Sequence, residues 1–530
     1  MSAADRSPSR VVAVALAGLA LVYAVLVQRF DWMCDDAFIS LRYARNLALG
    51  RGLVFNPGEA PPVEGYTNLL WVLWLTPFER FELDVPLVAR LTSAACGMVL
   101  ALLVARASAQ TARDGLSAVW SLALLVTLPP FFVWSTSGLE TMAFSLALFA
   151  TFAPLSSKRP RAWLAALAGV AAVLLRADGF ALVALVLAAS FAAARAVNCR
   201  ERRNAVLGAS LAIGVAIAAH FGWRWLHYGE WAPNTARVKV EFGAASLVNG
   251  AKYVGTFLAT FPSVLVAALV ACVFALRSRQ AHALAALFVV LGVFAYSTLV
   301  GGDFMAMGRF LVPSLAFLAF AFGAALGAAF APRDETTPRT WIAPLVATLA
   351  CAALSLPAAW NVHVVPAALR ERLRFRWNNP LWLSEQAQWV MMRDQARLWS
   401  FTGRALKART KPGESLVCGT IGALGYYSDL WIHDPFGLVN REEFAPLSDE
   451  ARRTPGHQRR VPLETFLAKN PTYLEAALVL RDQPYADFRP GSVPGGLKGS
   501  KIAEPEWVEI GDVPQMPDAL VLRLTRYKQR

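Results

Sequence analysis

The chain has 530 residues, of which 56% are hydrophobic and 17% are charged, and its formal net charge at pH 7 is +14. Its mean hydropathy is +0.43, and its apolar runs are long enough to cross a bilayer core of roughly 30 Å. These properties exclude a soluble enzyme. They predict a polytopic α-helical membrane protein with about 11 transmembrane helices.

The first apolar run covers residues 11–28 and follows Arg6 and Arg10. A basic stretch before an apolar run is typical of a secretory signal, but this run is longer than the apolar part of most signal peptides. Because many more apolar runs follow, we interpret it as an uncleaved signal anchor.

A long loop over residues 29–85 comes next, and its length is more than a plain connection needs. Apolar residues recur at helical spacing from Asp36 to Leu49, which predicts an amphipathic helix. The apolar stretch Leu69–Phe78 is too short for a span and carries Trp71 and Trp74. This composition favours a helix in the membrane interface, so we expect the loop to lie on the outer membrane face.

The remaining predicted spans are residues 86–105, 115–134, 139–155, 162–175, 179–195, 204–225, 254–276, 282–300, 310–331 and 342–360. With the N-terminus inside, every inner loop carries Arg or Lys, as the distribution of charges in membrane proteins requires. Topology therefore explains much of the positive charge and argues against a nucleic-acid partner. We expect a multi-pass protein of the bacterial inner (plasma) membrane.

The same topology collects polar residues on the opposite, extracytoplasmic or periplasmic side. They are Asp35, Asp36, Glu64, Glu140, Arg176, Asp178, Asn234, Lys239, Asp303 and Arg309. The active site is expected there.

Residues 361–530 are polar enough to form a soluble extracytoplasmic α/β domain of their own, after a transmembrane catalytic domain over 1–360 that includes the 29–85 loop. The pattern predicts a helix over Gln386–Lys407 and strands at Ser415–Cys418, Leu430–His433, Thr472–Leu480 and Ala519–Leu524, the first two flanking a Gly-rich turn. The aromatic side chains Tyr426, Tyr427 and Trp431 could stack on the flat face of a bound ring or fill the core of this domain, and the core is favoured.

Asp35 and Asp36 form a carboxylate pair directly after the first span. Such a pair at a membrane surface can deprotonate an acceptor hydroxyl or bind a divalent cation (Mg or Mn). The structural alternative is that one of them caps the following helix. Both chemical roles point to a lipid-linked substrate.

Basic side chains at the outer ends of spans could hold a phosphate headgroup or could simply anchor helices at the membrane surface. Arg309, Lys239 and Arg176 are the candidates. Arg176 and Asp178 interrupt an apolar stretch, where a charge costs roughly 2.5–3.5 kcal/mol, so they are expected to pair in a turn or to contact substrate.

Glu140 and Asn234 could bind polar groups of a substrate or sit at helix ends. Six cysteines are present, with no zinc-like spacing, and we expect them to be reduced. No glycine-rich phosphate loop follows a strand, which argues against a soluble nucleotide-linked substrate.

Four motifs in order carry a family resemblance: residues 35–39 (DDAFI), 63–68 (VEGYTN), 228–235 (YGEWAPNT) and 301–310, with Gly-Gly-Asp at 301–303 and Gly-Arg-Phe at 308–310. Together they resemble the GT-C superfamily of polyprenyl-phosphate-sugar glycosyltransferases. More narrowly, they resemble the subgroup with the mycobacterial terminal β-(1→2)-arabinofuranosyltransferases.

The resemblance implies an inverting transfer of a sugar, with arabinofuranose as one candidate, from a polyprenyl-phosphate donor to a glycan or lipid acceptor. It implies Asp36 as the general base and Asp35 as its helper or a cation ligand. Arg309, Asp303, Lys239, Asn234, Glu140, Arg176, Asp178 and Glu64 are the predicted substrate-binding residues. A transporter of lipid-linked or small solutes and a non-catalytic cell-envelope assembly protein remain alternatives.

Overall fold

The structure is a computed structural model that describes residues 10–239, 243–331, 340–376, 382–444, 459–480, 503–508 and 520–527. It divides into two compact units. The first comprises residues 1–32, 89–223 and 242–389, and the second comprises residues 33–88, 224–241 and 390–530. Each unit therefore combines stretches that are far apart in the sequence.

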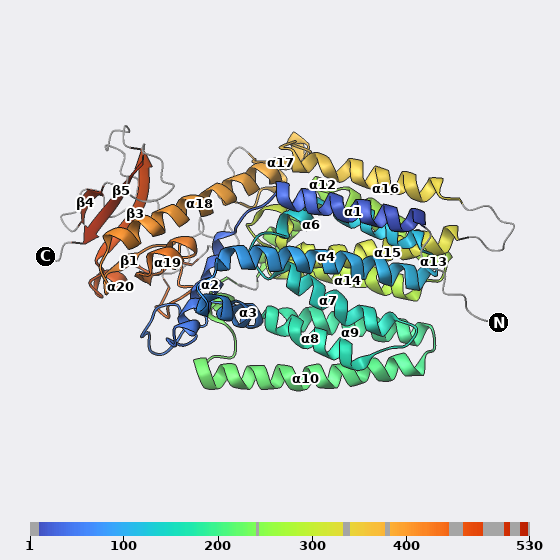
Figure 1. Cartoon of the computed structure of the whole chain (residues 1–530), viewed down its shortest axis with the longest axis horizontal. Helices are drawn as coiled ribbons and strands as arrows, with labels where there is room; N and C mark the ends of the chain where they lie inside the picture. The colour runs from blue at the N-terminus through green and yellow to red at the C-terminus, as the bar shows by residue number, and fades with distance from the viewer. Residues whose placement is uncertain are drawn as a thin grey trace. The chain divides into compact units, whose positions relative to one another are not determined.

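The first unit is helical, and Figure 1 shows its long helices running side by side. Its elements are α1 (Arg10–Arg29), most of α4 (Val85–Ala112), α5 (Leu116–Val126), α6 (Pro129–Trp134), α7 (Thr141–Ser156), α8 (Ala162–Leu175), α9 (Gly179–Ala196), most of α10 (Arg200–Tyr228), α12 (Ala244–Thr260), α13 (Ser263–Arg277), α14 (Ala281–Leu299), η1 (Ala306–Leu311), α15 (Val312–Phe330), α16 (Ile342–Ser355), η2 (Leu356–Ala359) and α17 (Ala367–Leu373).

All eleven predicted apolar segments are helical in the described part of the chain, which confirms a polytopic membrane fold. Within that part, seven helices are long and apolar enough to cross a membrane, or eight if the bent pair α12 and α13 is one span. The helices α5, α7 and α8 are apolar but shorter. The predicted span 254–276 is bent by 85° between α12 and α13. Pro262 lies at this bend, and Pro129 and Pro130 begin α6 where the predicted span 115–134 is broken, because proline interrupts the helical hydrogen bonds.

Helix α15 is the centre of the first unit and packs against α5, α7, α13 and α14. Small residues allow the close approach to α5. A Cβ added at Gly323 would lie 1.9 Å from the Ser121 hydroxyl oxygen, and one at Gly327 would lie 1.7 Å from that of Ser117. The glycines of α15 therefore fix the distance between these two helices.

The second unit contains α2 (Asp35–Ala48), α3 (Leu69–Arg80), α11 (Asn234–Lys239), most of α18 (Glu385–Arg409), α19 (Ala423–Ser428), α20 (Leu463–Leu467) and a five-stranded sheet. The strands are β1 (Ser415–Val417), β2 (Trp431–His433), β3 (Tyr473–Leu480), β4 (Ala503–Val508) and β5 (Leu520–Tyr527), in the order β2-β1-β3-β5-β4. Strand β1 is parallel to β2 and β3, whereas β5 is antiparallel to β3 and β4, which lie beside it in Figure 1.

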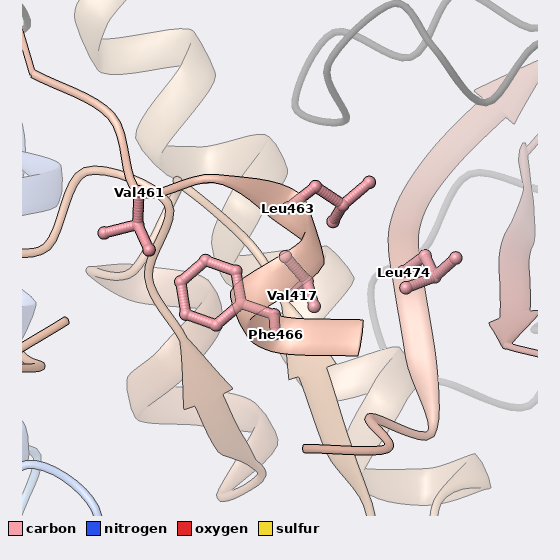
Figure 2. Close-up of a cluster of buried hydrophobic side chains, with 5 residues drawn as sticks. All are labelled: Val417, Val461, Leu463, Phe466 and Leu474. Atoms are coloured by element: carbon pink, nitrogen blue, oxygen red, sulfur yellow. The ribbon is translucent and has the colours of Figure 1, made fainter. Parts of the chain in front are cut away.

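The predicted α2, α3 and α18 helices and four predicted strands are confirmed. The Gly-rich turn expected between β1 and β2 is wrong in part, because residues 423–428 form the helix α19, which packs against α2. A buried apolar cluster supports the sheet: Val417 of β1 and Leu474 of β3 lie with Leu463 and Phe466 of α20 and with Val461 (Figure 2).

The first loop is grouped with the C-terminal residues rather than with the helical unit that the sequence analysis assigned it to. A buried arginine contributes to this grouping. Arg42 donates hydrogen bonds to the carbonyl oxygens of Phe55 (2.8 Å), Gly425 (2.5 Å) and Leu430 (2.6 Å). Because buried carbonyls and a buried guanidinium each need partners, these bonds join α2 to the segment between β1 and β2. The catalytic and extracytoplasmic roles expected for these stretches stay predictions.

Candidate active site

The second unit contains a group of charged side chains that we name the carboxylate site, formed by Asp35, Asp36 and Lys239. Asp35 and Asp36 lie in the first turn of α2, where the positive end of the helix dipole favours carboxylates. Lys239 is the last residue of α11, and its Nζ lies 3.6 Å from Oδ2 of Asp36. The side chains of Lys239 and Asp36 are 26% and 25% exposed, so a substrate could reach them.

Asp35 has a different environment from Asp36. Its Oδ1 accepts a hydrogen bond of 2.8 Å from the backbone N–H of Ala423. Burial raises the pKa of Asp35 to about 7, and the hydrogen bond from Ala423 opposes this rise. The two carboxylates thus have unlike partners, a backbone amide for Asp35 and an ammonium for Asp36, which is an arrangement that can separate their roles.

The contacts of Asp35 do not support the alternative that its side chain caps α2. The residue at the N-cap of α2 is Cys34, which makes no side-chain cap hydrogen bond, and the Asp35 carboxylate bonds to a residue 388 positions later in the chain. No local pattern predicts Ala423 as the partner of Asp35, because the two residues are adjacent only after folding.

Asn234 lies at the start of α11, and its side chain is buried against a turn at residues 434–440. Its Nδ2 donates to the carbonyl oxygens of Gly437 (2.7 Å), Leu438 (2.9 Å) and Asn440 (3.1 Å), and its Oδ1 accepts from Nε of Arg237 (2.9 Å). These contacts use the amide for holding α11 in place. They favour the structural reading of Asn234 over a direct contact with sugar.

Glu64 forms a buried ion pair with Arg224, which sequence analysis did not single out. The Nε of Arg224 lies 2.7 Å from Oε2 of Glu64, the Nη2 lies 3.2 Å from Oε1, and both side chains are 2% exposed. The backbone N–H of Asn234 also donates to the carbonyl oxygen of Glu64 at 3.0 Å. Glu64 therefore connects the first loop to α11, the helix that carries Lys239.

The first unit brings five predicted residues together in what we name the arginine cluster: Arg176, Arg309, Glu140, Asp178 and Asp303. Arg176 bonds to both carboxylate oxygens of Asp178, at 2.9 and 2.7 Å, and lies 3.9 Å from Glu140. Arg309 bonds to Asp303 at 2.8 Å. The pairing of Arg176 with Asp178 is one of the two arrangements predicted from the sequence.

An aromatic ring joins the two halves of the arginine cluster. The guanidinium carbons of Arg176 and Arg309 lie 5.0 and 5.1 Å from the centroid of the Phe310 ring. The five side chains carry three negative and two positive charges, so they orient the guanidinium groups more than they concentrate positive charge. Tyr296 adds a hydrogen bond of 2.7 Å to Asp178.

A strained loop positions Arg309. Met307 and Gly308 in η1 have φ values of 59° and 61°. Residues other than glycine adopt this left-handed backbone region only at a cost in free energy. A Cβ added at Gly308 would lie 2.4 Å from Cδ2 of Phe257, so both backbone conformation and space require glycine there. Such a backbone persists only when its surroundings hold it.

A buried pair that we name the η1 clamp, Arg376 and Glu385, holds this loop. Arg376 donates to the carbonyl oxygens of Phe304 (2.8 Å) and Met305 (2.9 Å), and Glu385 accepts the N–H of Met307 (2.6 Å). The two side chains lie 2.6 Å apart and are 4% and 6% exposed. Neither was predicted, because no local pattern links residues 376 and 385 to the 301–310 motif.

The described residues contain no group of three or more His, Cys, Asp or Glu side chains that could hold a metal ion. Asp35 and Asp36 could still offer two carboxylates to Mg²⁺, which commonly completes its shell with water and substrate phosphate. The Lys239 ammonium beside Asp36 would compete with such a cation.

The fold is that of the GT-C glycosyltransferases. The chain matches the crystal structure of ArnT from Cupriavidus metallidurans bound to undecaprenyl phosphate with a TM-score of 0.54, over 98% of both chains at 16% identity. The apo state of the same protein matches with the same TM-score and identity over 97% of both chains. The GT-C resemblance found in the sequence is therefore confirmed for the fold.

A particular relative agrees with the narrower resemblance. The terminal beta-(1->2)-arabinofuranosyltransferase of Mycobacterium tuberculosis (strain ATCC 25618 / H37Rv) is 32% identical over 236 residues. This match covers 40% of the present chain, and it spans about a third (35%) of the relative's length. A family model described as a domain of unknown function (DUF8728) matches residues 383–526.

Proposed function

We propose that this protein is a membrane glycosyltransferase that moves a sugar from a polyprenyl-phosphate donor to an extracytoplasmic glycan or lipid acceptor. The observation that carries the proposal is the carboxylate site, in which a partly exposed Asp36 faces Lys239 beside Asp35, in a chain with the GT-C fold. Arabinofuranose is the candidate sugar, on the similarity to the mycobacterial arabinofuranosyltransferase.

In the proposed step, Asp36 removes the proton of the acceptor hydroxyl while the oxygen of that hydroxyl attacks the anomeric carbon of the sugar. The new glycosidic bond forms as the bond from that carbon to the phosphate oxygen breaks, and polyprenyl phosphate leaves with the bonding electrons. A single displacement of this kind inverts the anomeric configuration. Asp35 is the alternative base or a helper that orients the acceptor.

Lys239 has a role at both stages of this step. Before transfer its ammonium balances the charge of Asp36 at 3.6 Å. When Asp36 takes up the proton it becomes neutral, and the ammonium can then stabilise the charge that develops on the leaving phosphate. The same ammonium can therefore interact first with Asp36 and then with the leaving phosphate without changing its position.

The arginine cluster is proposed to bind the substrate's polar groups. Arg309 and Arg176 would contact phosphate oxygens, since an oriented guanidinium binds phosphate with two parallel hydrogen bonds. Asp303, Asp178 and Glu140 would orient these arginines or accept hydrogen bonds from sugar hydroxyls. Glu64 and Asn234 are proposed to act on the substrate through α11.

A divalent cation is a second proposal for the positive charge at Asp35 and Asp36. Bound there it would supply a Lewis acid for the phosphate. Treating the purified protein with EDTA and then adding Mg²⁺ or Mn²⁺ tests this. Full activity in EDTA would leave Lys239 as the positive group.

The outer-face orientation is also a proposal, supported by basic residues in every predicted inner loop. A reporter enzyme that is active only in the periplasm, fused after residue 530, should be active. A cytoplasmic reporter at the same place should be active instead if the orientation is reversed.

The first experiment incubates the purified full chain with a panel of polyprenyl-phosphate sugars, including arabinofuranose and hexoses, with candidate acceptors. Mass spectrometry measures released polyprenyl phosphate and the glycosylated product. Asp36→Asn should reduce release by at least about 10³-fold, since it removes the base. Asp394→Asn, at a side chain that is 54% exposed, is the matched control and should be fully active.

Full activity of both Asp36→Asn and Asp35→Asn would contradict the proposed chemistry. Movement of labelled lipid across vesicles without a new glycosidic bond would favour a transporter. Neither activity, with every donor and acceptor tested, would favour a non-catalytic assembly protein.

A further inference from the structure

The segment 418–440 of the second unit contacts both sides of the carboxylate site. It runs from the end of β1 through α19 and β2 to the turn 434–440, inside the region that matches a domain of unknown function. Its contacts reach Asp35 on α2 and Asn234 on α11, which are separated from it by about 200 to 400 residues of sequence. The segment is therefore a candidate for holding α2 and α11 in fixed positions relative to each other.

The first contact orients Asp35. The Ala423 N–H donates to Oδ1 of Asp35 at 2.8 Å. The preceding Gly422 lets the backbones approach, since a Cβ there would lie 2.1 Å from the carbonyl oxygen of Asp35 and 2.6 Å from its carboxylate carbon. Any side chain at position 422 would have to displace the start of α2, so glycine is needed for this approach.

The second contact begins at Asp434, whose side chain is fully buried directly after β2. Its carboxylate accepts the N–H groups of Phe436 (2.8 Å) and Leu438 (2.6 Å). These bonds close the turn 434–440 and direct its carbonyl groups toward the Asn234 amide, which bonds to three of them. A carboxylate that satisfies several backbone amides is a strong local restraint.

The turn determines where Lys239 lies. Asn234 is the first residue of α11 and Lys239 is the last, so the short helix carries the ammonium at a fixed distance from its anchored end. Glu64 supports the same end by accepting the Asn234 N–H at 3.0 Å. Loss of the Asn234 anchor would let Lys239 move away from Asp36.

We propose that the segment 418–440 is a positioning element of the active site, in which Gly422 and Ala423 set Asp35 while Asp434 and Asn234 set Lys239. This inference rests on the proposed function for the meaning of the site, and it gives part of the region of unknown function a specific role. The four residues act through Asp35 and Lys239 and are positioning residues, not catalytic ones.

The first test is independent of catalysis and uses hydrogen exchange of the full chain in detergent micelles. Asp35→Ala should speed exchange of the Ala423 amide by about tenfold or more, because its acceptor is removed. Asp434→Asn should speed exchange in the turn 434–440 and also in α11. Unchanged α11 exchange would overturn the link from Asp434 to Lys239, and an unchanged Ala423 amide would overturn the link to Asp35.

The second test measures kinetics. Gly422→Ala should lower kcat by about tenfold or more with the donor KM changed less than about twofold, as expected when a reacting group is displaced. Gly222→Ala is the matched control, because a Cβ at Gly222 meets no atom within 4 Å. Equal kcat in the Gly422→Ala protein and wild type would overturn the Asp35 arm.

A double-mutant cycle separates positioning from general destabilisation. Asn234→Ala should lower kcat in the wild type but should add little in a Lys239→Met background, since residues that act as a unit are not additive. Additive losses would overturn the Lys239 arm. Asp434→Asn provides a second variant if Asn234→Ala folds poorly.

The proposed function and the positioning role can fail separately. If wild type releases no polyprenyl phosphate from any donor, the proposed function fails, whereas the exchange results still decide whether the segment holds Asp35 and α11. If wild type is active and the exchange and kinetic effects are absent, the positioning role fails alone.

Discussion

The two neighbouring aspartates differ because their partners differ. Burial raises the pKa of Asp35 to about 7, with the Ala423 amide acting in the opposite direction, whereas Asp36 is beside an ammonium. The sequence identified both residues but could not assign their roles, because Ala423 and Lys239 come from distant segments. Their different environments therefore follow from the fold, and which of the two is the base stays a prediction.

The pKa of Asp35 leads to a prediction of pH dependence. Below about pH 7 its carboxyl group is mostly protonated and cannot act as a base, and above this pH it is mostly charged. Transfer at saturating substrate should therefore rise about tenfold per pH unit on the acid side and level off above about 7. Asp35→Asn should remove this limb from the profile of the residual activity. A wild-type profile that is flat from pH 5.5 to 8 would contradict an ionised Asp35 in the reaction.

Lys239 can be tested by changing its charge at nearly constant size. Lys239→Met should lower kcat by about 10²-fold, since one lost stabilising charge in an active site typically has this effect, and Lys239→Arg should keep part of the activity. Steady-state release of polyprenyl phosphate measures both. Lys252→Met, which changes another lysine of the chain, is the comparison. Equal losses in Lys239→Arg and Lys239→Met would mean that charge is not what matters.

Elements position the reactive groups through packing that sequence patterns do not reveal. The 301–310 motif was recognisable, yet its strained backbone is held by Arg376 and Glu385, which no motif contains. Helix periodicity predicted α18, whose first residue is Glu385, but gave no reason to expect that this residue would bind the N–H of Met307. A buried pair of this kind is defined by three-dimensional proximity alone.

Removing one member of the η1 clamp should destabilise the folded protein. Arg376→Met leaves Glu385 and two carbonyl groups without their partner, which should destabilise the protein by roughly 3–5 kcal/mol. Thermal unfolding in detergent should show this as a lower midpoint, and donor KM should rise because the Arg309 loop relaxes. Arg370→Met, a change at a residue of α17, should leave both values near wild type. An unchanged midpoint in Arg376→Met would show that the clamp does not hold the loop.

The contact between α15 and α5 makes a second prediction for an element. The Gly327→Ala methyl carbon would lie 1.7 Å from the hydroxyl oxygen of Ser117 and 2.9 Å from its Cβ, so α15 and α5 must shift to make room. Overpacking of this kind should cost about 1–3 kcal/mol. Gly214→Ala, where a Cβ meets nothing within 4 Å, is the control. Similar melting temperatures for the two variants would contradict the close packing of α15 against α5.

The whole molecule combines separated stretches of chain in each unit. The first loop, the end of α10 with α11 and the C-terminal residues together form the second unit. The carboxylate site depends on this combination, because Asp36, Lys239 and Ala423 each come from a different one of the three stretches. The sequence analysis named Asp36 and Lys239 as candidates, but a division of the chain into successive domains did not predict that residues near Ala423 would contact the same site.

The proposed single displacement makes a prediction for the whole reaction. The product should have the anomeric configuration opposite to that of the donor, because one nucleophile enters as the phosphate leaves on the other side of the carbon. Nuclear magnetic resonance of the purified product, with a donor of defined configuration, measures this. Retention of configuration would rule out the single step and would require a different role for the carboxylate pair.

The sequence by itself determined the membrane class, the order of the apolar segments, the helices α2, α3 and α18 and the resemblance to GT-C enzymes. Hydrophobic length, periodicity and short motifs are local properties, and the chain carries them before it folds. The tertiary structure alone decided that Lys239 faces Asp36, that Ala423 binds Asp35 and that Arg376 and Glu385 hold the Arg309 loop. These contacts join residues far apart in the chain, and such pairings depend on how helices and turns pack, which no local pattern encodes.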